Sequence, residues 1–364
     1  MLDSFHIKNF KNFRNLTLET LGRINLIVGR NNVGKSSLLE AISIYITNGE
    51  ENWLRELLAN RGEEIIKTND SEINAENVKQ HYISLFSGWE ENYSQDYEIE
   101  LGTNDKEAVP VRISQVYIRE GKSESSFSME TFNEEMLRTQ TERSSITNAG
   151  LHISNGLQSS IIPYNKQRSY LNVFDEKCPF QYIPVDMIVR INNAKLFDKI
   201  SLSPDEDYVL EALKIINPAI NRIRFIDTNE GRFSERIPIV TLEGSDKRYR
   251  LGSMGDGINR ILTIVLALLN CKKGILLLDE FETGLHYSVQ TQLWQIVFML
   301  AEKLDVQVFV TSHSNDCIRS FTKANTNGFG QLIRLTDRNG LIVATTYPNN
   351  DDIKFAIEND LEIR

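Results

Sequence analysis

The stretch Gly29-Arg30-Asn31-Asn32-Val33-Gly34-Lys35-Ser36 decides the fold of this chain. It fits the phosphate-loop pattern G-x-x-x-x-G-K-[ST], and it lies between the apolar run 23–28 and the helical pattern 35–46. Glycines let backbone N–H groups surround phosphates, Lys35 adds a compact positive charge, and the Ser36 hydroxyl can ligate Mg²⁺. The sequence therefore predicts a site for a nucleotide phosphate chain over residues 29–36, extended by Ser37, the next residue of the helix. The alternative is a glycine turn with a surface lysine.

A second apolar run, Gly274-Ile275-Leu276-Leu277-Leu278, ends in two carboxylates, Asp279 and Glu280. We expect a buried strand there, with Asp279 holding Mg²⁺ and Glu280 orienting the water that attacks a phosphate. Any buried strand can end in acids, so the prediction depends on the phosphate loop upstream.

Two further segments carry candidate site residues. The apolar run 308–311 leads to His313, which at the carboxyl end of a parallel strand would contact the γ-phosphate; its alternative is a structural histidine. Ser253, Gly255 and Gly257 open a long apolar helix pattern, and backbone N–H groups at such a helix start favour anions. Their alternative is a flexible helix cap.

The rest of the chain shows three textures. Alternating apolar residues such as Phe5, Ile7, Leu16 and Leu18 predict an N-terminal antiparallel hairpin. Residues 49–177 are polar with short strand patterns, and 120–160, the most polar part, is expected to be partly disordered. From residue 181 strands and helices alternate, which predicts a parallel sheet, and one helix is expected to start at Ser203 with Pro204 in its first turn.

Composition excludes several classes of protein. The 364 residues carry a net charge of −10, whereas nucleic-acid coats are basic, so DNA contact is expected only at local clusters such as 8–14 and 247–250. Three cysteines without paired spacing argue against a disulfide framework or a zinc cluster. No apolar run approaches the roughly 18 residues of a membrane span, and no leader pattern opens the chain. We expect a cytoplasmic protein that does not enter a membrane.

At these motifs the chain resembles the ABC-type ATPases of the RecF, SMC and OLD grouping, most closely stand-alone OLD-like ATPases. The hairpin 4–13 resembles the N-terminus of that group, Asp279-Glu280 its Walker B pair, His313 its switch histidine and 282–286 its D-loop. The segment Ser253 to Gly257 stands where the group has its signature, although Ser-Met-Gly-Asp-Gly departs from the transporter form. The Q-loop glutamine is not placed; Gln181 is the candidate.

The resemblance implies an α/β ABC-type P-loop fold and an enzyme that binds ATP with Mg²⁺ and hydrolyses it to ADP and phosphate. It also implies a head-to-tail homodimer, or a higher oligomer, with ATP between the phosphate loop of one chain and Ser253 and Gly255 of the other. The sequence division is then an ATPase part at 1–48, an inserted polar α+β lobe at 49–180, a second ATPase part at 181–346 and a tail helix at 347–364.

Three functions follow as hypotheses. The first is a nucleotide-driven switch for a DNA-related or anti-phage effector; since only 51 residues follow His313, we expect a nuclease or toxin on a separate chain. The second is a scaffold that senses ATP without hydrolysing it and holds a partner protein. The third is the nucleotide-binding subunit of a transporter, which the atypical signature and the polar insertion disfavour.

Overall fold

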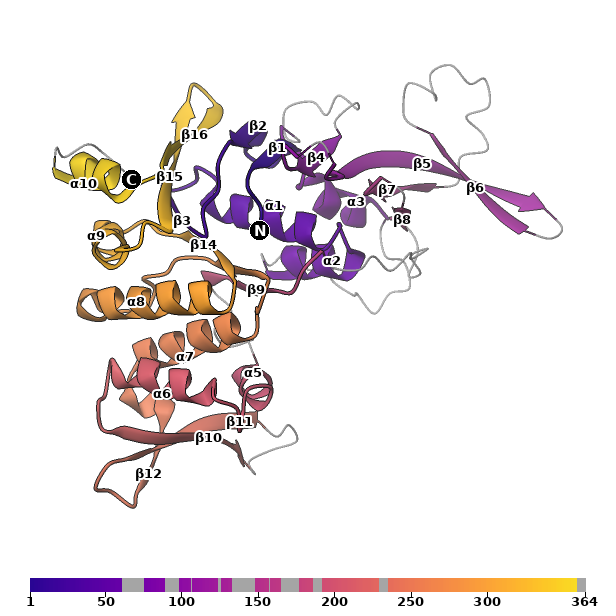
Figure 1. The fold of residues 1–364 in the computed structure, drawn as a ribbon. Coiled ribbons are helices and arrows are strands. Elements are labelled where there is room, and N and C mark those ends of the chain that lie inside the picture. Colours follow the sequence, from indigo (N-terminus) through magenta and orange to yellow (C-terminus); the bar gives the residue numbers. More distant parts are fainter. Residues whose placement is uncertain are drawn as a thin grey trace.

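The computed structural model describes residues 1–60, 75–88, 98–105, 107–123, 126–132, 148–156, 158–164, 177–185, 192–228 and 235–358. Three sheets organise this part of the chain, and helices pack between and beside them (Figure 1). None of the described helices combines the length and the apolar character that crossing a lipid bilayer requires.

The central sheet contains the strands that the sequence motifs follow. Its order is β16 (Leu341–Tyr347), β15 (Gly330–Arg338), β3 (Ile24–Val28), β14 (Gln307–Thr311), β13 (Ile275–Leu278) and β9 (Phe180–Ile183). All neighbours pair in parallel except β15 and β16, which form an antiparallel hairpin at one edge. The predicted α/β fold with a mixed, largely parallel sheet is confirmed.

This sheet is buried on both faces because alternate side chains of each strand enter different hydrophobic cores. On β3, Leu26 and Val28 belong to the core built with α7 (Asp256–Leu269) and α8 (Tyr287–Lys303), whereas Ile27 belongs to the core around α1 (Lys35–Ile46). The continuous apolar runs in the sequence reflect this two-sided burial, which fixes the strand ends relative to the helices.

A second, antiparallel sheet covers the α1 side. The hairpin β1 (Phe5–Phe10) and β2 (Phe13–Leu18) is confirmed, and β1 also pairs with β4 (Ile99–Gly102). The sheet continues through β5 (Val111–Ser123), β7 (Asn148–Ser154) and β8 (Ser159–Pro163), with β6 (Ser126–Phe132) paired to β5. Residues on both sides of the predicted boundary at 48/49 therefore share one sheet and one core. The domain division itself stays a prediction.

The third sheet lies at the end of the molecule farthest from β1 and β2 in Figure 1. Its antiparallel strands are β10 (Ile220–Thr228), β11 (Glu235–Leu242) and β12 (Arg248–Arg250), and the short 3-10 segment η3 (Leu251–Met254) joins β12 to α7. The remaining helices are α2 (Glu51–Asn60), α3 (Ala75–Ile83), α5 (Asn193–Asp198), α6 (Glu206–Lys214), α9 (Asn315–Ala324) and α10 (Asn350–Glu358).

One sequence expectation was wrong. The helix predicted to begin at Ser203 begins at Glu206, because the Ser203 hydroxyl donates to the Ile200 carbonyl and accepts from the Asp205 N–H, which closes a separate turn. Within 120–160, where the sequence predicts partial disorder, the structure describes β6, β7 and the start of β8, and the disorder itself stays a prediction. Residues 124–125, 133–147 and 157 lie outside the described part.

Candidate functional site

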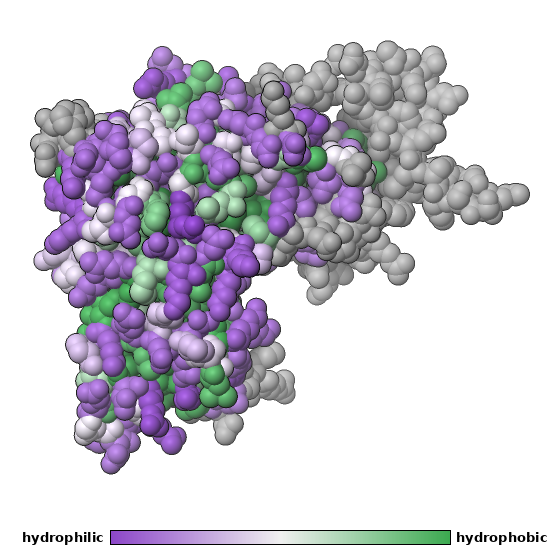
Figure 2. Space-filling view, in the orientation of Figure 1, coloured by the Kyte–Doolittle hydropathy of each residue, from purple (hydrophilic) through white to green (hydrophobic). Residues whose placement is uncertain are grey.

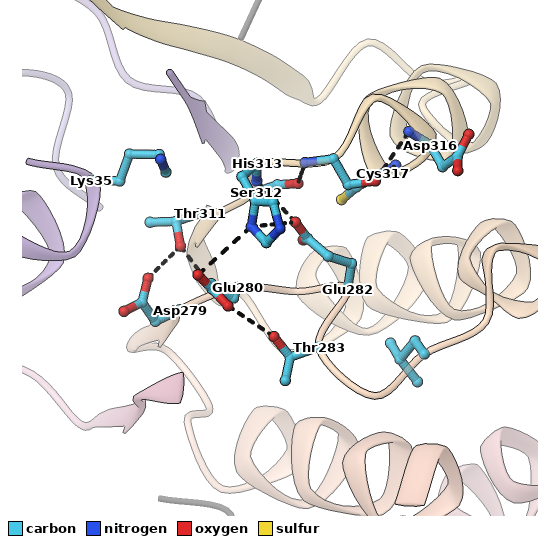
Figure 3. Close-up of polar contacts among 12 residues, drawn as sticks. Lys35, Asp279, Glu280, Glu282, Thr283, Thr311, Ser312, His313, Asp316 and Cys317 are labelled. Carbon is cyan, nitrogen blue, oxygen red and sulfur yellow. Dashed lines mark hydrogen bonds and ion pairs between the residues drawn. The ribbon is translucent and has the colours of Figure 1, made fainter. Parts of the chain in front are cut away.

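The candidate site lies at the carboxyl ends of β3, β14 and β13, three neighbours in the central sheet. Val28 leads into Gly29, Leu278 into Asp279 and Thr311 into Ser312. The register places Leu278 beside Val310 and Thr311 beside Ile27, so the three strands end nearly level. In an open α/β sheet this edge is where ligands bind, and the predicted site residues Lys35, Asp279, Glu280 and His313 gather there (Figure 3).

The phosphate loop has a backbone that only small residues permit. Gly34 has a φ of 96°, and a Cβ there would lie 2.7 Å from the Phe13 ring; a Cβ on Gly29 would lie 2.6 Å from the Leu335 carbonyl oxygen. Val33 is buried under the loop, while Arg30, Asn31 and Asn32 are exposed. The loop is thus held from below and open above, which suits a phosphate chain surrounded by backbone N–H groups.

Lys35 opens α1 and directs its amine along the loop. Its Nζ donates to the carbonyl oxygens of Gly29 at 2.8 Å and Arg30 at 3.0 Å. Burial lowers the pKa of Lys35, whereas the nearby carboxylates Asp279 and Glu280 act in the opposite direction. The amine is therefore a half-buried positive charge between the loop and the acids. Ser37, the third residue of α1, is buried behind it.

Asp279 is the group best placed for a divalent cation. Its side chain is buried, it accepts a short hydrogen bond from the Thr311 hydroxyl, and the Ser36 hydroxyl also bonds to it. Burial raises the pKa of the carboxyl, and these two hydrogen bonds oppose that effect. Ser36 and Asp279 together present two oxygens, which fits Mg²⁺ because that ion usually takes one or two protein ligands and completes its shell with phosphate and water. No group of three His, Cys, Asp or Glu side chains gathers as a metal cage among the described residues.

Glu280 adopts an uncommon backbone conformation, with a φ of 49°. Its N–H donates to the Thr311 hydroxyl at 2.8 Å, and its Oε2 accepts from the Thr283 hydroxyl at 3.0 Å. Its Oε1 lies 3.6 Å from Nδ1 of His313. A left-handed non-glycine residue costs about 1–3 kcal/mol and persists where surrounding bonds fix it. The carboxylate is thus held in a set position at the strand end.

Glu282, which the sequence indicated only as the first residue of the D-loop-like stretch 282–286, is also a site residue. Its Oε1 accepts the backbone N–H of His313 at 2.9 Å and lies 3.2 Å from His313 Nδ1, while its side chain is only 10% exposed. Its other oxygen has no hydrogen-bond partner in the described part of the chain. Glu282 therefore orients both the histidine ring and the loop that carries it (Figure 3). In the sequence Glu282 is a third acid, two residues after Glu280, but nothing in the sequence indicates that it contacts His313.

Arg260 is the second residue that sequence reasoning missed, because arginines are rarely buried. It is fully buried in α7, and its Nη2 donates to the carbonyl oxygens of Asp279 at 2.7 Å and Glu280 at 2.9 Å. Burial lowers the pKa of Arg260 to about 10. Neither Nε nor Nη1 has a hydrogen-bond partner among the described residues. Arg260 thus ties α7 to the end of β13.

The segment before α7 does not join this cluster within one chain. Ser253 is exposed and its hydroxyl donates to the Arg250 carbonyl at 2.7 Å, while Gly255 is exposed with a φ of 104°. Gly257 packs against Gly284, whose carbonyl oxygen would lie 2.8 Å from a Cβ at position 257. Gln181 lies within β9 opposite Leu276 rather than after the strand end. Ser253 and Gly255 are therefore available to another molecule.

Comparison with known proteins agrees with this geometry. A family model described as "AAA domain, putative AbiEii toxin, Type IV TA system" matches residues 24–317, which is most of the chain and includes every site segment above. The chain belongs to this family. It is therefore an AAA-family ATPase domain, a class that binds and hydrolyses nucleotide.

Relatives of this AAA-domain protein carry consistent descriptions. A Helicobacter pylori protein described as an ATP/GTP phosphatase is 26% identical over 336 residues, covering 87% of this chain and 86% of its own. An uncharacterized protein of Methanocaldococcus jannaschii is 46% identical over 67 residues, which cover 17% of this chain and 31% of its own. A solved SMC head, bound to the C-winged helix domain of ScpA, matches with a TM-score of 0.53 at 13% identity over 95% of this chain and 98% of its own. The last likeness shows an ABC-type P-loop fold.

Proposed function

We propose that this protein hydrolyses ATP at the edge of the central sheet and acts as a nucleotide-driven switch for an effector on another chain. The observation that carries the proposal is the meeting of Lys35, Ser36, Asp279, Glu280 and His313 at three adjacent strand ends. These groups supply what phosphoryl transfer needs, namely charge for the phosphates, oxygens for a cation and a carboxylate for the attacking water.

Each residue then has a role. Residues 29–36 bind the phosphates by backbone N–H groups, and the Lys35 amine leaves the loop carbonyls to reach the outer phosphates. Ser36 and Asp279 hold Mg²⁺, which supplies charge neutralisation when bound. Glu280 orients the water and accepts its proton, and His313 contacts the γ-phosphate while Glu282 keeps its ring in place.

We place the protein among stand-alone OLD-like ATPases that work as head-to-tail homodimers. The support is the exposed segment with Ser253 and Gly255, which makes no hydrogen bond to the phosphate loop of its own chain among the bonds described. In a dimer these residues would close the ATP site of the second copy. The family description, which mentions a putative toxin of a Type IV TA system, supports a link to a toxin effector in defence.

The first experiment measures ATP turnover of the wild type, Lys35→Ala and Glu280→Gln. We expect both variants to fall by at least about a hundredfold, since each loses a group that acts on the transition state. Equal ATP turnover in all three proteins would refute the proposal. If the wild type binds ATP yet releases no phosphate in a single turnover, the scaffold hypothesis replaces it.

A mixing experiment tests the shared site. Lys35→Ala and Ser253→Arg chains are each expected to be inactive alone. When they are mixed in equal amounts, a heterodimer of the head-to-tail kind has one of its two sites intact, so about a quarter of the wild-type turnover should return if chains pair at random, and up to about half if only heterodimers form. The absence of any recovery from a mixture that forms heterodimers would show that the site lies within one chain.

A further inference from the structure

The outer face of the sheet β10-β11-β12 is not used by the proposed ATP site. The inner face packs on the core through Ile223 and Val240, which are fully buried, with Phe225, Leu242 and Tyr249 against the same core. Side chains alternate along a strand, so the residues between them point away from the core. The outer face therefore consists of side chains that the core does not cover.

Four arginines stand on this face in two adjacent rows. The register aligns Arg222 of β10 with Thr241 of β11 and Arg248 of β12, and it aligns Arg224 with Ile239 and Arg250. Neighbouring strands lie about 4.8 Å apart and alternate residues about 6.8 Å apart, so the arginine Cα atoms form a grid of roughly 7 by 10 Å. All four arginines are exposed.

Three of these cations are not neutralised by the described part of the chain. Arg224 pairs with Glu206 at the start of α6, but Arg222, Arg248 and Arg250 form no ion pair there. The nearest acids lie off the two arginine rows: Asp227 alternates with the outward positions of β10, Glu235 lies opposite Thr228 at the far end of the sheet, and Glu243 and Asp246 lie in the turn before β12. On a chain with a net charge of −10, this face concentrates positive charge.

We propose that this face, formed by Arg222, Arg224, Arg248 and Arg250, binds the backbone of a double-stranded nucleic acid without reading its sequence. A duplex carries one negative charge per about 1.7 Å of its axis, so a grid of this size faces several phosphates at once. Guanidinium groups match phosphate oxygens by paired N–H donors. The carboxylates of an acidic protein partner would be spread irregularly over its surface and would match this regular grid less well.

The same face explains why the contact is made with the backbone. Its described residues include no aromatic side chain, whereas proteins that bind single strands on a sheet stack bases on aromatic rings. The remaining outward residues are short or aliphatic, including Thr241, Ile239 and Ile226. Such a surface positions a duplex by charge and leaves base edges unread.

The test is a fluorescence-anisotropy titration of the full chain with a labelled DNA duplex of about two turns, without nucleotide and at several salt concentrations. The variant carries Arg222→Ala, Arg248→Ala and Arg250→Ala. The matched control carries Arg319→Ala, Arg338→Ala and Lys354→Ala, which remove equal charge from exposed positions elsewhere. Because binding is measured without ATP, its outcome is separate from that of the proposed hydrolysis.

We expect the variant to bind at least tenfold more weakly, and the slope of log K against log[salt] to become shallower by about 2 to 3, while the control stays close to wild type. Equal affinity and slope in variant and wild type would overturn the proposal, as would an equal loss in the control. Binding of polyglutamate with no binding of duplex would overturn it in favour of an acidic protein. If the triple variant is unfolded, the single reversal Arg248→Glu must give the same direction of change.

Discussion

At the scale of single residues, Glu282 fixes the position of His313. Its carboxylate accepts a hydrogen bond from the backbone N–H of His313 and lies next to Nδ1 of the same residue. Glu282→Gln keeps the size of the side chain but removes its charge. We expect kcat for ATP hydrolysis to fall roughly ten- to hundredfold, because one charged hydrogen bond is lost. KM should change little. Steady-state kinetics measures both. Glu302→Gln, at an exposed position on α8, is the control, and an unchanged kcat in Glu282→Gln would refute the role.

Asp279 shows the cost of placing a cation ligand in the core. Because burial raises the pKa of its carboxyl, ionisation at neutral pH opposes folding, and the stability that the protonated form contributes is lost as pH rises through the folded-state pKa. Asp279→Asn, which can still accept from Thr311, should raise the thermal midpoint at pH 7 by a few degrees in EDTA. The gain should shrink toward pH 4. A lower midpoint at pH 7 would contradict this reasoning.

At the scale of elements, the hairpin β1-β2 supports the phosphate loop. The Phe13 ring of β2 fills the space where a Cβ on Gly34 would lie, and Gly34 also has a positive φ. Gly34→Ala should lower the free energy of unfolding by about 1–2 kcal/mol for the left-handed backbone, with the ring clash added. Gly244→Ala, with a φ of 73° and open space around it, isolates the backbone part. Urea unfolding should give the larger loss for Gly34→Ala, and equal losses would exclude the clash.

Local sequence patterns predicted the bounds of a helix well where no competing hydrogen bond was present. The helix 35–46 was predicted with the bounds of α1, because the loop fixes its start and apolar spacing its length. The start of α6 was misplaced because Ser203 has the chemistry of a cap but bonds backward to Ile200. The pairing of β1 with β4 joins residues nearly a hundred positions apart, and no local pattern carries such a register.

The candidate site was predictable as far as its parts follow strands. Lys35, Asp279, Glu280 and His313 come after apolar runs, and parallel strands bring their ends together. Arg260 and Glu282 were not predictable, since their roles depend on which carbonyls and N–H groups lie opposite them in space. A residue that binds the backbone of a distant segment produces no sequence motif, because its partner is not at a fixed spacing along the chain.

At the scale of the whole molecule, the proposed dimer should depend on nucleotide. Glu280→Gln keeps the phosphate loop and the cation ligands but slows hydrolysis, so ATP with Mg²⁺ should hold two chains together. Light scattering after gel filtration should show twice the 41.7 kDa of one chain. Lys35→Ala under the same conditions should remain a monomer. A monomer in both cases would contradict the ATP-sandwiched arrangement.

Charge is also organised over the whole molecule. The formal charge of −10 disfavours wrapping nucleic acid, yet it does not prevent one sheet face from carrying arginines in register. Figure 2 shows hydrophilic side chains over most of the visible face, with hydrophobic ones gathered in smaller areas. The net charge is an average over the whole chain and does not show where charges gather. The pairing of β10, β11 and β12 is what places these arginines together on one face of an otherwise acidic protein.

The position of β3 in the central sheet has a consequence for synthesis. Its two neighbours are β14 and β15, so among the described strands it has no partner until residues after 306 exist. At roughly 5–20 residues per second, a ribosome needs about 15–60 s to add the intervening stretch of about 280 residues. During that time a strand of five apolar or buried residues waits unpaired on the nascent chain, so its protection by a chaperone or by α1 should decide the yield of soluble protein in the cell.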